Sequence, residues 1–152
     1  MNSKGQVSTE YLVILAVVLV VALVVVYLVG GFSSLGAGSL QTQSQNYWGS
    51  TAPFSISTIK ASASTLTLEI INNDLQQLTL TDIQINGASV SPAGVPLTFN
   101  SGQDVVVNAT LAAPCGASGS PFTYNNVVFV YTKGTITGLK ESGTKPLVGK
   151  CS

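Results

Sequence analysis

One carboxylate, Glu10, stands next to the longest apolar run of the chain. Residues 11–29 follow it without a charged residue, a proline or a glycine. An ionised carboxylate beside hydrocarbon is expensive, so it favours a partner of opposite charge. A local explanation is also open, because an anion in the first turn of a helix gains about 0.3–1 kcal/mol from the helix dipole. The residue type and its position therefore indicate either a pairing role or an ordinary helix start.

The residues around this carboxylate form the pattern KGQVSTEYL over residues 4–12. This stretch resembles the processing site of archaeal type IV pilins with class III signal peptides, whose pattern is Q-x-S-x-E-x-x-x-L. Gln6, Ser8 and Glu10 occupy the first three fixed positions. Ile14 stands where the pattern has leucine, which is a conservative departure. The resemblance concerns processing and assembly, and it does not indicate what the filament does.

The resemblance implies that a prepilin peptidase cuts between Gly5 and Gln6 and removes a leader of residues 1–5. It also implies that Glu10 offsets the new positive α-amine of Gln6 on a neighbouring subunit during assembly. Gly5 and Gln6 are therefore the expected cleavage site, and Gln6 and Glu10 are the expected assembly residues. An N-terminal glutamine that cyclises to pyroglutamate would lack this amine and would offer Glu10 only a neutral donor.

The apolar run itself predicts a membrane-spanning helix. A helix needs about 17–25 apolar residues to cross the hydrocarbon core, and lipid requires every backbone group to be paired within the segment. Lys4, before the run, favours a cytoplasmic N-terminus and an exported remainder. A cleaved secretory signal is the alternative, but its apolar core usually runs about 7–15 residues. The length of the run and the motif together favour a retained helix.

Helical spacing continues beyond the apolar run. The apolar positions there are Phe32, Leu35, Leu40 and Tyr47. We expect one N-terminal helix over residues 6–50, with a soft point at Gly30 and Gly31, because glycine costs a helix roughly 1 kcal/mol relative to alanine. Tyr47 and Trp48 are expected to pack against the following domain. A flexible Ser/Gln/Gly linker is the alternative.

From Phe54 onward the apolar residues follow a period of two, which is typical of strands. About seven short strands separated by turn residues predict an antiparallel sandwich or barrel over residues 51–152. A slip of phase at residues 81–82 indicates a β-bulge. Residues 127–131 are apolar on both faces and predict a central strand or one covered by the helix. The expected fold class is α+β, with a long N-terminal apolar helix followed by a small pilin-like or Ig-like β-domain.

Cys115 and Cys151 are the two cysteines of the chain. An exported domain can hold a disulfide, and no other pair competes, so we expect these two residues to be bonded. Closing a loop of roughly 35 residues should stabilise the domain by about 3–4 kcal/mol. A metal site is the alternative, but two cysteines without a histidine do not make a zinc site.

The sequence also contains one N-x-S/T sequon, which begins at Asn108. Asn108 is therefore a candidate N-glycosylation site, and related filaments are often glycosylated. The alternative is that Asn108 is an ordinary outward-facing strand residue.

Charge is too sparse to indicate an electrostatic partner. Charged residues make up 8% of the chain and the formal net charge is zero, which argues against a nucleic-acid partner. The absence of histidine removes the usual general base, and Asp74, Asp82 and Asp104 lack metal-ligand spacing. We therefore expect no enzymatic activity, no catalytic residues, no cofactor and no metal site. Five lysines are expected to be solvated surface charges: Lys60, Lys133, Lys140, Lys145 and Lys150.

The pattern as a whole predicts a structural subunit of an archaeal type IV pilus-like surface filament that serves adhesion. Its partners would be identical subunits, the prepilin peptidase and, before assembly, the membrane. The subunit would be membrane-inserted as a precursor and extracellular after assembly. The alternative is a membrane-anchored extracellular binding module, or a minor pilin that does not form the filament shaft.

The cleavage site gives a first test. Intact-mass analysis of the exported protein should show the loss of residues 1–5 and a mature chain that begins at Gln6, free or as pyroglutamate. A mature terminus near Ser39, beyond the apolar run, would instead establish a conventional secretory signal and would remove the anchor.

Overall fold

The computed structural model describes the backbone of residues 3–152 and the side chains of residues 8–28 and 38–152. The chain forms two compact units, Met1–Ser39 and Leu40–Ser152, which are described separately below. The first unit is helical in all of its described residues, and the second contains the last turns of the same helix and all the strands.

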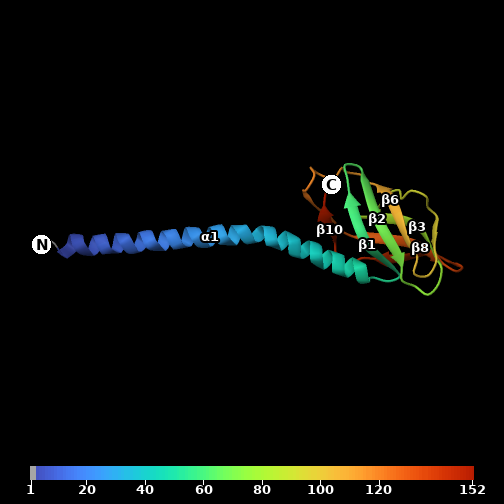
Figure 1. Ribbon diagram of the computed structural model, residues 1–152, viewed down its shortest axis with the longest axis horizontal. Helices are drawn as coiled ribbons and strands as arrows, with labels where there is room; N and C mark the ends of the chain where they lie inside the picture. The colour runs from blue at the N-terminus through green and yellow to red at the C-terminus, as the bar shows by residue number, and fades with distance from the viewer. Residues whose placement is uncertain (1–2) are drawn as a thin grey trace. The chain divides into compact units, whose positions relative to one another are not determined.

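The helix α1 runs from Ser3 to Ser50 and includes both the apolar run and the Ser/Gln-rich segment after it (Figure 1). The backbone stays helical through Gly30 and Gly31, so the helix prediction is correct as far as Ser50 and the linker alternative is wrong. The packing of the side chains around these two glycines, including Phe32 and Leu35, lies outside the described residues. The predicted soft point therefore stays a prediction.

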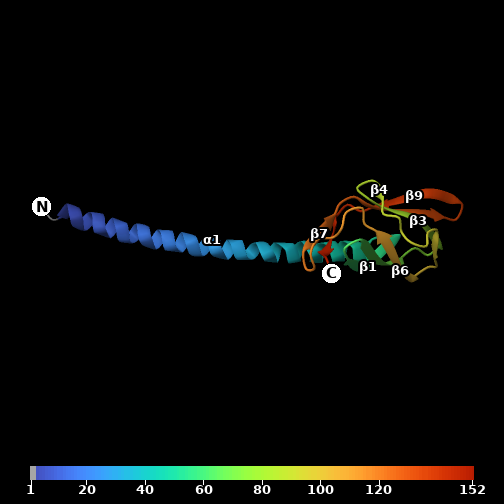
Figure 2. The same cartoon turned by 90° about the horizontal axis from the view of Figure 1, so that it is seen from above.

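Ten strands follow the helix, and eight of them form two antiparallel layers (Figure 2). Their bounds are β1 (Phe54–Ala61), β2 (Thr65–Asn72), β3 (Leu78–Ile85), β4 (Ala88–Ser89), β5 (Leu97–Phe99), β6 (Asp104–Thr110), β7 (Pro121–Tyr124), β8 (Val127–Lys133), β9 (Ile136–Ser142) and β10 (Leu147–Lys150). One layer has the strand order β1-β2-β6, and the other has the order β4-β3-β8-β9 with β5 also paired to β3. The strands β10 and β7 form a separate pair.

The α+β fold and its antiparallel sheets are therefore as predicted from the sequence. The strand β8 lies between β3 and β9, which agrees with the central position predicted for residues 127–131. The register of β3 against β8 shifts between Leu80 and Asp82, which confirms the predicted bulge. The strands beyond the predicted seven include β4 and β5, of two and three residues, which are too short to give a period-two signal.

Apolar residues alternate with polar ones along the strands, and the apolar residues form the core. In β2, Leu66, Leu68 and Ile70 are fully buried, whereas Thr67 and Glu69 between them are partly exposed on the outer face. These side chains belong to one hydrophobic cluster that also contains buried residues of the other layer, among them Leu80, Ile83 and Phe129. Two facing sheets with inward apolar and outward polar residues are the arrangement expected of a β-sandwich.

The last turns of α1 belong to this core. Trp48 is 1% exposed, and its ring meets the ring of Phe129 edge to face with centroids 6.0 Å apart. A side-chain carbon at Gly143 would overlap the indole, so this glycine leaves the space that the tryptophan occupies. One turn earlier, the hydroxyl of Ser44 accepts a hydrogen bond from the N–H of Val148 at 2.9 Å. The predicted packing role of Trp48 is confirmed.

Cys115 and Cys151 form a disulfide, with Cα atoms 5.8 Å apart. The bond ties the loop after β6 to the C-terminal end of the chain. Backbone hydrogen bonds reinforce the connection, because the N–H of Gly119 donates to the Cys151 carbonyl at 2.7 Å and the N–H of Cys151 donates to the Ser120 carbonyl at 2.8 Å. The loop after β6 and the C-terminal end of the chain are therefore held together both by the disulfide and by hydrogen bonds.

Replacing both cysteines with serine should lower the free energy of unfolding of the β-domain by about 3–4 kcal/mol, because the bond closes a long loop in the unfolded chain. The measurement is guanidinium unfolding of the detergent-solubilised protein, followed by the fluorescence of the single tryptophan, Trp48. Ser118→Ala, on the exposed surface of the same loop, should be neutral. Equal midpoints for the double serine variant and the parent would contradict a stabilising disulfide.

Candidate functional site

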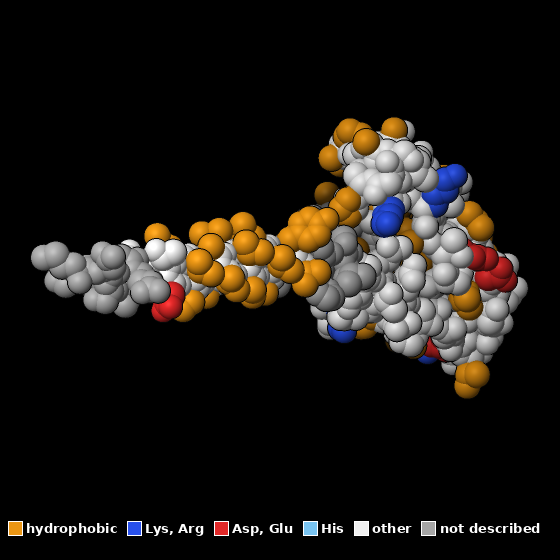
Figure 3. Space-filling model, turned by 60° about the vertical axis from the view of Figure 1, so that its left-hand side comes forward, with side chains coloured by type: hydrophobic (Ala, Val, Ile, Leu, Met, Phe, Trp, Pro, Cys, Tyr) orange, Lys and Arg blue, Asp and Glu red, His pale blue; other side chains and the backbone are white. Residues whose placement is uncertain are grey.

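The candidate site is the apolar segment Ser8–Leu28 of α1, which is long and apolar enough to cross a membrane. None of its most apolar window is buried within the chain, so it is not a core helix of this protein. Figure 3 shows hydrophobic side chains covering the visible face of this segment. A helix that is hydrophobic all round requires cover from lipid or from other helices.

Tyrosines mark both ends of the segment. Tyr11 is 65% exposed and Tyr27 is 82% exposed. At a rise of 1.5 Å per residue, the two Cα atoms lie roughly 24 Å apart along the helix. Tyrosine rings favour the interface between hydrocarbon and water, so these positions fit the two borders of a bilayer core.

Glu10 lies at the N-terminal edge of this segment with its side chain exposed. Because α1 begins at Ser3, Glu10 falls in the second helical turn, and the first turn holds no acidic residue. The helix-dipole explanation therefore does not apply to the uncleaved chain, since this effect fades beyond the first turn. Gly5 and Gln6, the predicted cleavage and assembly residues, belong to the helical backbone, and their exposure lies outside the described residues.

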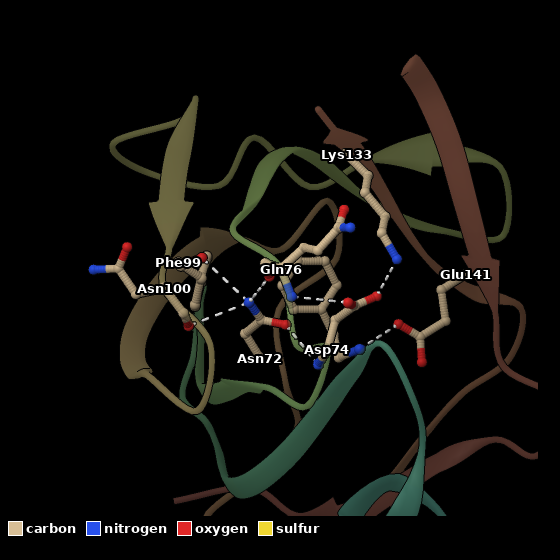
Figure 4. A network of polar contacts seen from close by, with 8 residues as sticks. Asn72, Asp74, Gln76, Phe99, Asn100, Lys133 and Glu141 are labelled. Atoms are coloured by element: carbon tan, nitrogen blue, oxygen red, sulfur yellow. Dashed lines mark hydrogen bonds and ion pairs between the residues drawn. The ribbon is translucent and has the colours of Figure 1, made fainter. Parts of the chain in front are cut away.

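The β-domain contains a cluster of polar groups, centred on the fully buried Asn72 (Figure 4). Its Nδ2 donates to the carbonyl oxygens of Gln76, Phe99 and Asn100 at 2.9, 3.2 and 3.2 Å. Its Oδ1 accepts the N–H of Asp74 at 2.9 Å. The side chain therefore fastens the turn between β2 and β3 to the end of β5. All the polar atoms of this side chain are used, so Asn72 holds this part of the structure together.

Asp74 and Lys133 extend this cluster as an ion pair, with Nζ and Oδ2 2.6 Å apart. The hydrogen bond from Lys133, followed by that from the Gln76 N–H, lowers the pKa of Asp74 below its usual value. The prediction that Lys133 is a solvated charge is therefore wrong, because its cationic end is held by Asp74. The two residues are distant in sequence, and strand pairing between β3 and β8 brings them together.

Glu141, on β9, is a half-buried carboxylate that the sequence analysis did not single out. Its Oε2 accepts the N–H of Phe54 at 2.9 Å, and its Oε1 is buried without a hydrogen-bond partner among the described residues. Burial raises its pKa to about 7, although hydrogen bonding from Phe54 and Thr51 opposes the shift. Burial and the charge of Glu141 also raise the pKa of Tyr131. The sequence held a weak signal for Glu141, because this residue follows Leu139 by two positions and shares its half-buried face of β9.

The other predicted residues occupy separate positions. Asn108 is exposed on β6, and its Oδ1 accepts a hydrogen bond from the Thr67 hydroxyl at 2.8 Å. Its glycosylation stays a prediction. Among the described residues, no group of three or more His, Cys, Asp or Glu side chains could hold a metal ion.

Comparison with known families gives a match that falls on the candidate site. The family model of the class III signal peptide matches residues 3–29. The resemblance inferred from Gln6, Ser8 and Glu10 is confirmed over this segment, which is similar to the prepilin signal of type IV pilin-like proteins. Such a signal implies processing by a prepilin peptidase and a membrane-inserted precursor. Comparison with curated proteins finds no match.

Glu141 predicts a pH dependence of stability. Its pKa is about 7 in the folded chain, against an ordinary value of 4.5, so the folded state holds this proton more tightly than the unfolded state. Its contribution to stability is therefore complete below about pH 4.5 and is lost as the pH rises through about 7. Glu141→Gln should remove this dependence and should raise stability at pH 8 by about 1–3 kcal/mol, a range that allows for partial exposure to solvent.

The measurement is guanidinium unfolding of the parent and Glu141→Gln proteins at pH 5 and pH 8. Glu69→Gln is the matched control, because hydrogen bonds from Ser57 and Thr58 lower the pKa of Glu69 and give the opposite sign. Parallel stability curves for the parent and Glu141→Gln would show that Glu141 is ionised in the folded protein throughout this range.

Proposed function

We propose that this chain is the structural subunit of an archaeal type IV pilus-like filament on the cell surface, where it serves adhesion. After cleavage between Gly5 and Gln6, the segment that held the precursor in the membrane would enter the filament core. The β-domain would form the outer sheath. The protein would act by assembly with identical subunits and not as an enzyme.

The observation that carries this proposal is the uncovered apolar surface of Ser8–Leu28 next to a prepilin-type signal. A simple anchor needs the same apolar surface, but it does not need a prepilin-type cleavage site before it. Release of the leader leaves the segment attached to the β-domain, so the mature chain keeps its apolar helix. Packing against helices of other copies then replaces lipid as the cover of this surface.

Glu10 would give the assembly its register. Cleavage would create a positive α-amine at Gln6, about one helical turn before the carboxylate. In the filament core, the amine of one subunit would pair with Glu10 of its neighbour. Paired charges are tolerated in an apolar environment far better than single ones, so subunits in the wrong register would be disfavoured.

Glu10→Gln tests this role. The variant should insert in the membrane and lose its leader normally, because the apolar run and the Gly5–Gln6 bond are unchanged. It should give a much lower yield of sheared filaments and should accumulate in the membrane fraction. Electron microscopy, together with mass spectrometry of sheared and membrane fractions, measures both quantities.

The matched control is Glu69→Gln, which removes a carboxylate from the outer face of β2 and should leave the filament yield unchanged. A wild-type yield from correctly cleaved Glu10→Gln protein would rule out the pairing role. A parent protein that is cleaved but stays in the membrane under all conditions would favour the membrane-anchored binding module, or a minor pilin, over the filament subunit.

A further inference from the structure

One apolar side chain projects from the turn between β2 and β3. Leu75 is 93% exposed, the highest value among the exposed large hydrophobic residues. The turn that carries it is fixed, because the Asp74 N–H bonds to the Asn72 side chain and the Gln76 N–H bonds to the Asp74 side chain at 2.9 and 3.0 Å. The ion pair between Asp74 and Lys133 holds the same turn against β8. Leu75 is thus an apolar group presented on a rigid support.

The same domain contains an apolar hollow of about 280 Å³. Its lining includes Ile85, Ala88, Val90, Leu111, Ala113 and Tyr124. The hairpin that forms one wall is fixed by the positive φ angles of Asn86 and Gly87, and by a hydrogen bond from the Ser89 hydroxyl to Asp82 at 2.5 Å. A cavity of about 150 Å³ can hold benzene, so this hollow accommodates the four-carbon side chain of a leucine.

The leucine and the hollow lie at opposite ends of the sandwich. Leu75 precedes the first residue of β3, and the hollow begins at the last residue of β3, Ile85. At about 3.3 Å per strand residue, β3 alone separates the two by roughly 23 Å. A residue cannot fill a hollow at the other end of its own domain. It can fill the hollow of a second copy that is displaced along the strand direction.

Uncompensated charges have the same end-to-end arrangement. Asp104 pairs with Ile71 at the Leu75 end of the β1-β2-β6 sheet. Lys60 and Lys150 each precede one partner of the Ala61–Cys151 bridge, at the end of the sheets where the hollow lies. All three side chains are exposed, and none forms an ion pair within the described part of the chain. One end of the domain therefore offers one negative charge, and the other offers two positive charges together with the carboxylate of Asp82, which accepts a hydrogen bond from Ser89 beside the hollow.

We propose that Leu75 of one subunit inserts into the hollow of the next subunit, with Asp104 of the first facing Lys60 and Lys150 of the second. This inference rests on the proposed filament and names the contact within its sheath. Two different surfaces meet in this contact, so each copy keeps a free leucine at one end and a free hollow at the other. A head-to-tail contact of this kind extends into an open array when its rotation does not close a ring, as in a filament.

The contact is too small to hold free subunits together. One leucine and a rim of polar residues fall well short of the roughly 800 Å² per partner that stable complexes bury. Helices packed in the filament core would hold neighbouring β-domains at a high effective concentration, at which a small contact forms. The pairing therefore belongs to the assembled state and not to the detergent-solubilised monomer.

Cysteine cross-linking tests the geometry. Leu75→Cys and Ala88→Cys are combined in one chain, and intact filaments are oxidised and run on a non-reducing gel. Both positions are exposed, so the substitutions should leave the subunit folded. The expected result is a ladder of cross-linked multimers, several-fold stronger than the bands from either single variant. The pair Val106→Cys and Ala88→Cys is the matched control, because Val106 is exposed on the face of β6 and should give no ladder.

A second measurement uses the stability of the filament. Leu75→Ser should lower the temperature at which filaments dissociate and should leave the unfolding midpoint of the solubilised subunit unchanged. Two results would overturn the contact and leave the proposed filament standing. One is a cysteine pair that forms normal filaments but gives no ladder, and the other is a Leu75→Ser variant whose filaments keep the dissociation temperature of the parent.

The remaining outcomes are also decisive. If Ala88→Trp, which fills the hollow, destabilises filaments while Leu75→Ser does not, the hollow takes a different occupant and the contact is wrong. If the parent chain forms no filaments, both the proposed function and the contact fail.

Discussion

The apolar surface of α1 is the constraint on which the rest of the molecule depends. The segment Ser8–Leu28 finds no cover within its own chain, and α1 is the single helix in the part of the chain that the structure describes. Its apolar area must therefore be removed from water by something else. Lipid supplies that cover for a precursor, and other copies of the helix supply it in the proposed filament. Both solutions leave the β-domain outside the apolar layer.

The β-domain must in consequence be stable without help from the apolar part of the helix. Three features supply this independence. Trp48 brings the last turns of α1 into the sandwich core, the Cys115–Cys151 bond closes the C-terminal end, and Asn72 fastens the turn before β3. The Asn72 cluster is polar and buried, and such clusters stabilise one arrangement only when every member is satisfied. A small domain with few charges thus keeps a defined surface for contacts with neighbours.

The sequence correctly predicted the features that depend on residues close to one another along the chain. The period of two, the slip at residues 81–82 and the apolar run all report local structure, and the structure agrees with each. The features it missed depend on contacts between distant strands. Asp74 meets Lys133 through the pairing of β3 with β8, and Glu141 reaches the Phe54 N–H from a different sheet. Glu141 lies on the same half-buried face of β9 as Leu139, but its burial is completed by the helix end and β1, which the sequence does not place beside it.

The position of Glu10 connects processing to assembly in the proposed mechanism. In the uncleaved chain the helix begins at Ser3, so the carboxylate lies in the second turn. The nearest cation in sequence, Lys4, is six residues away. Cleavage before Gln6 would remove Lys4 and put a positive amine about one turn from Glu10, at the edge of the apolar surface. Processing would therefore replace the positive charge of Lys4 with the positive α-amine of Gln6, which lies closer to Glu10. The precursor would lack the correctly placed amine and would stay in the membrane, and the mature chain would carry both members of the pair into the filament core.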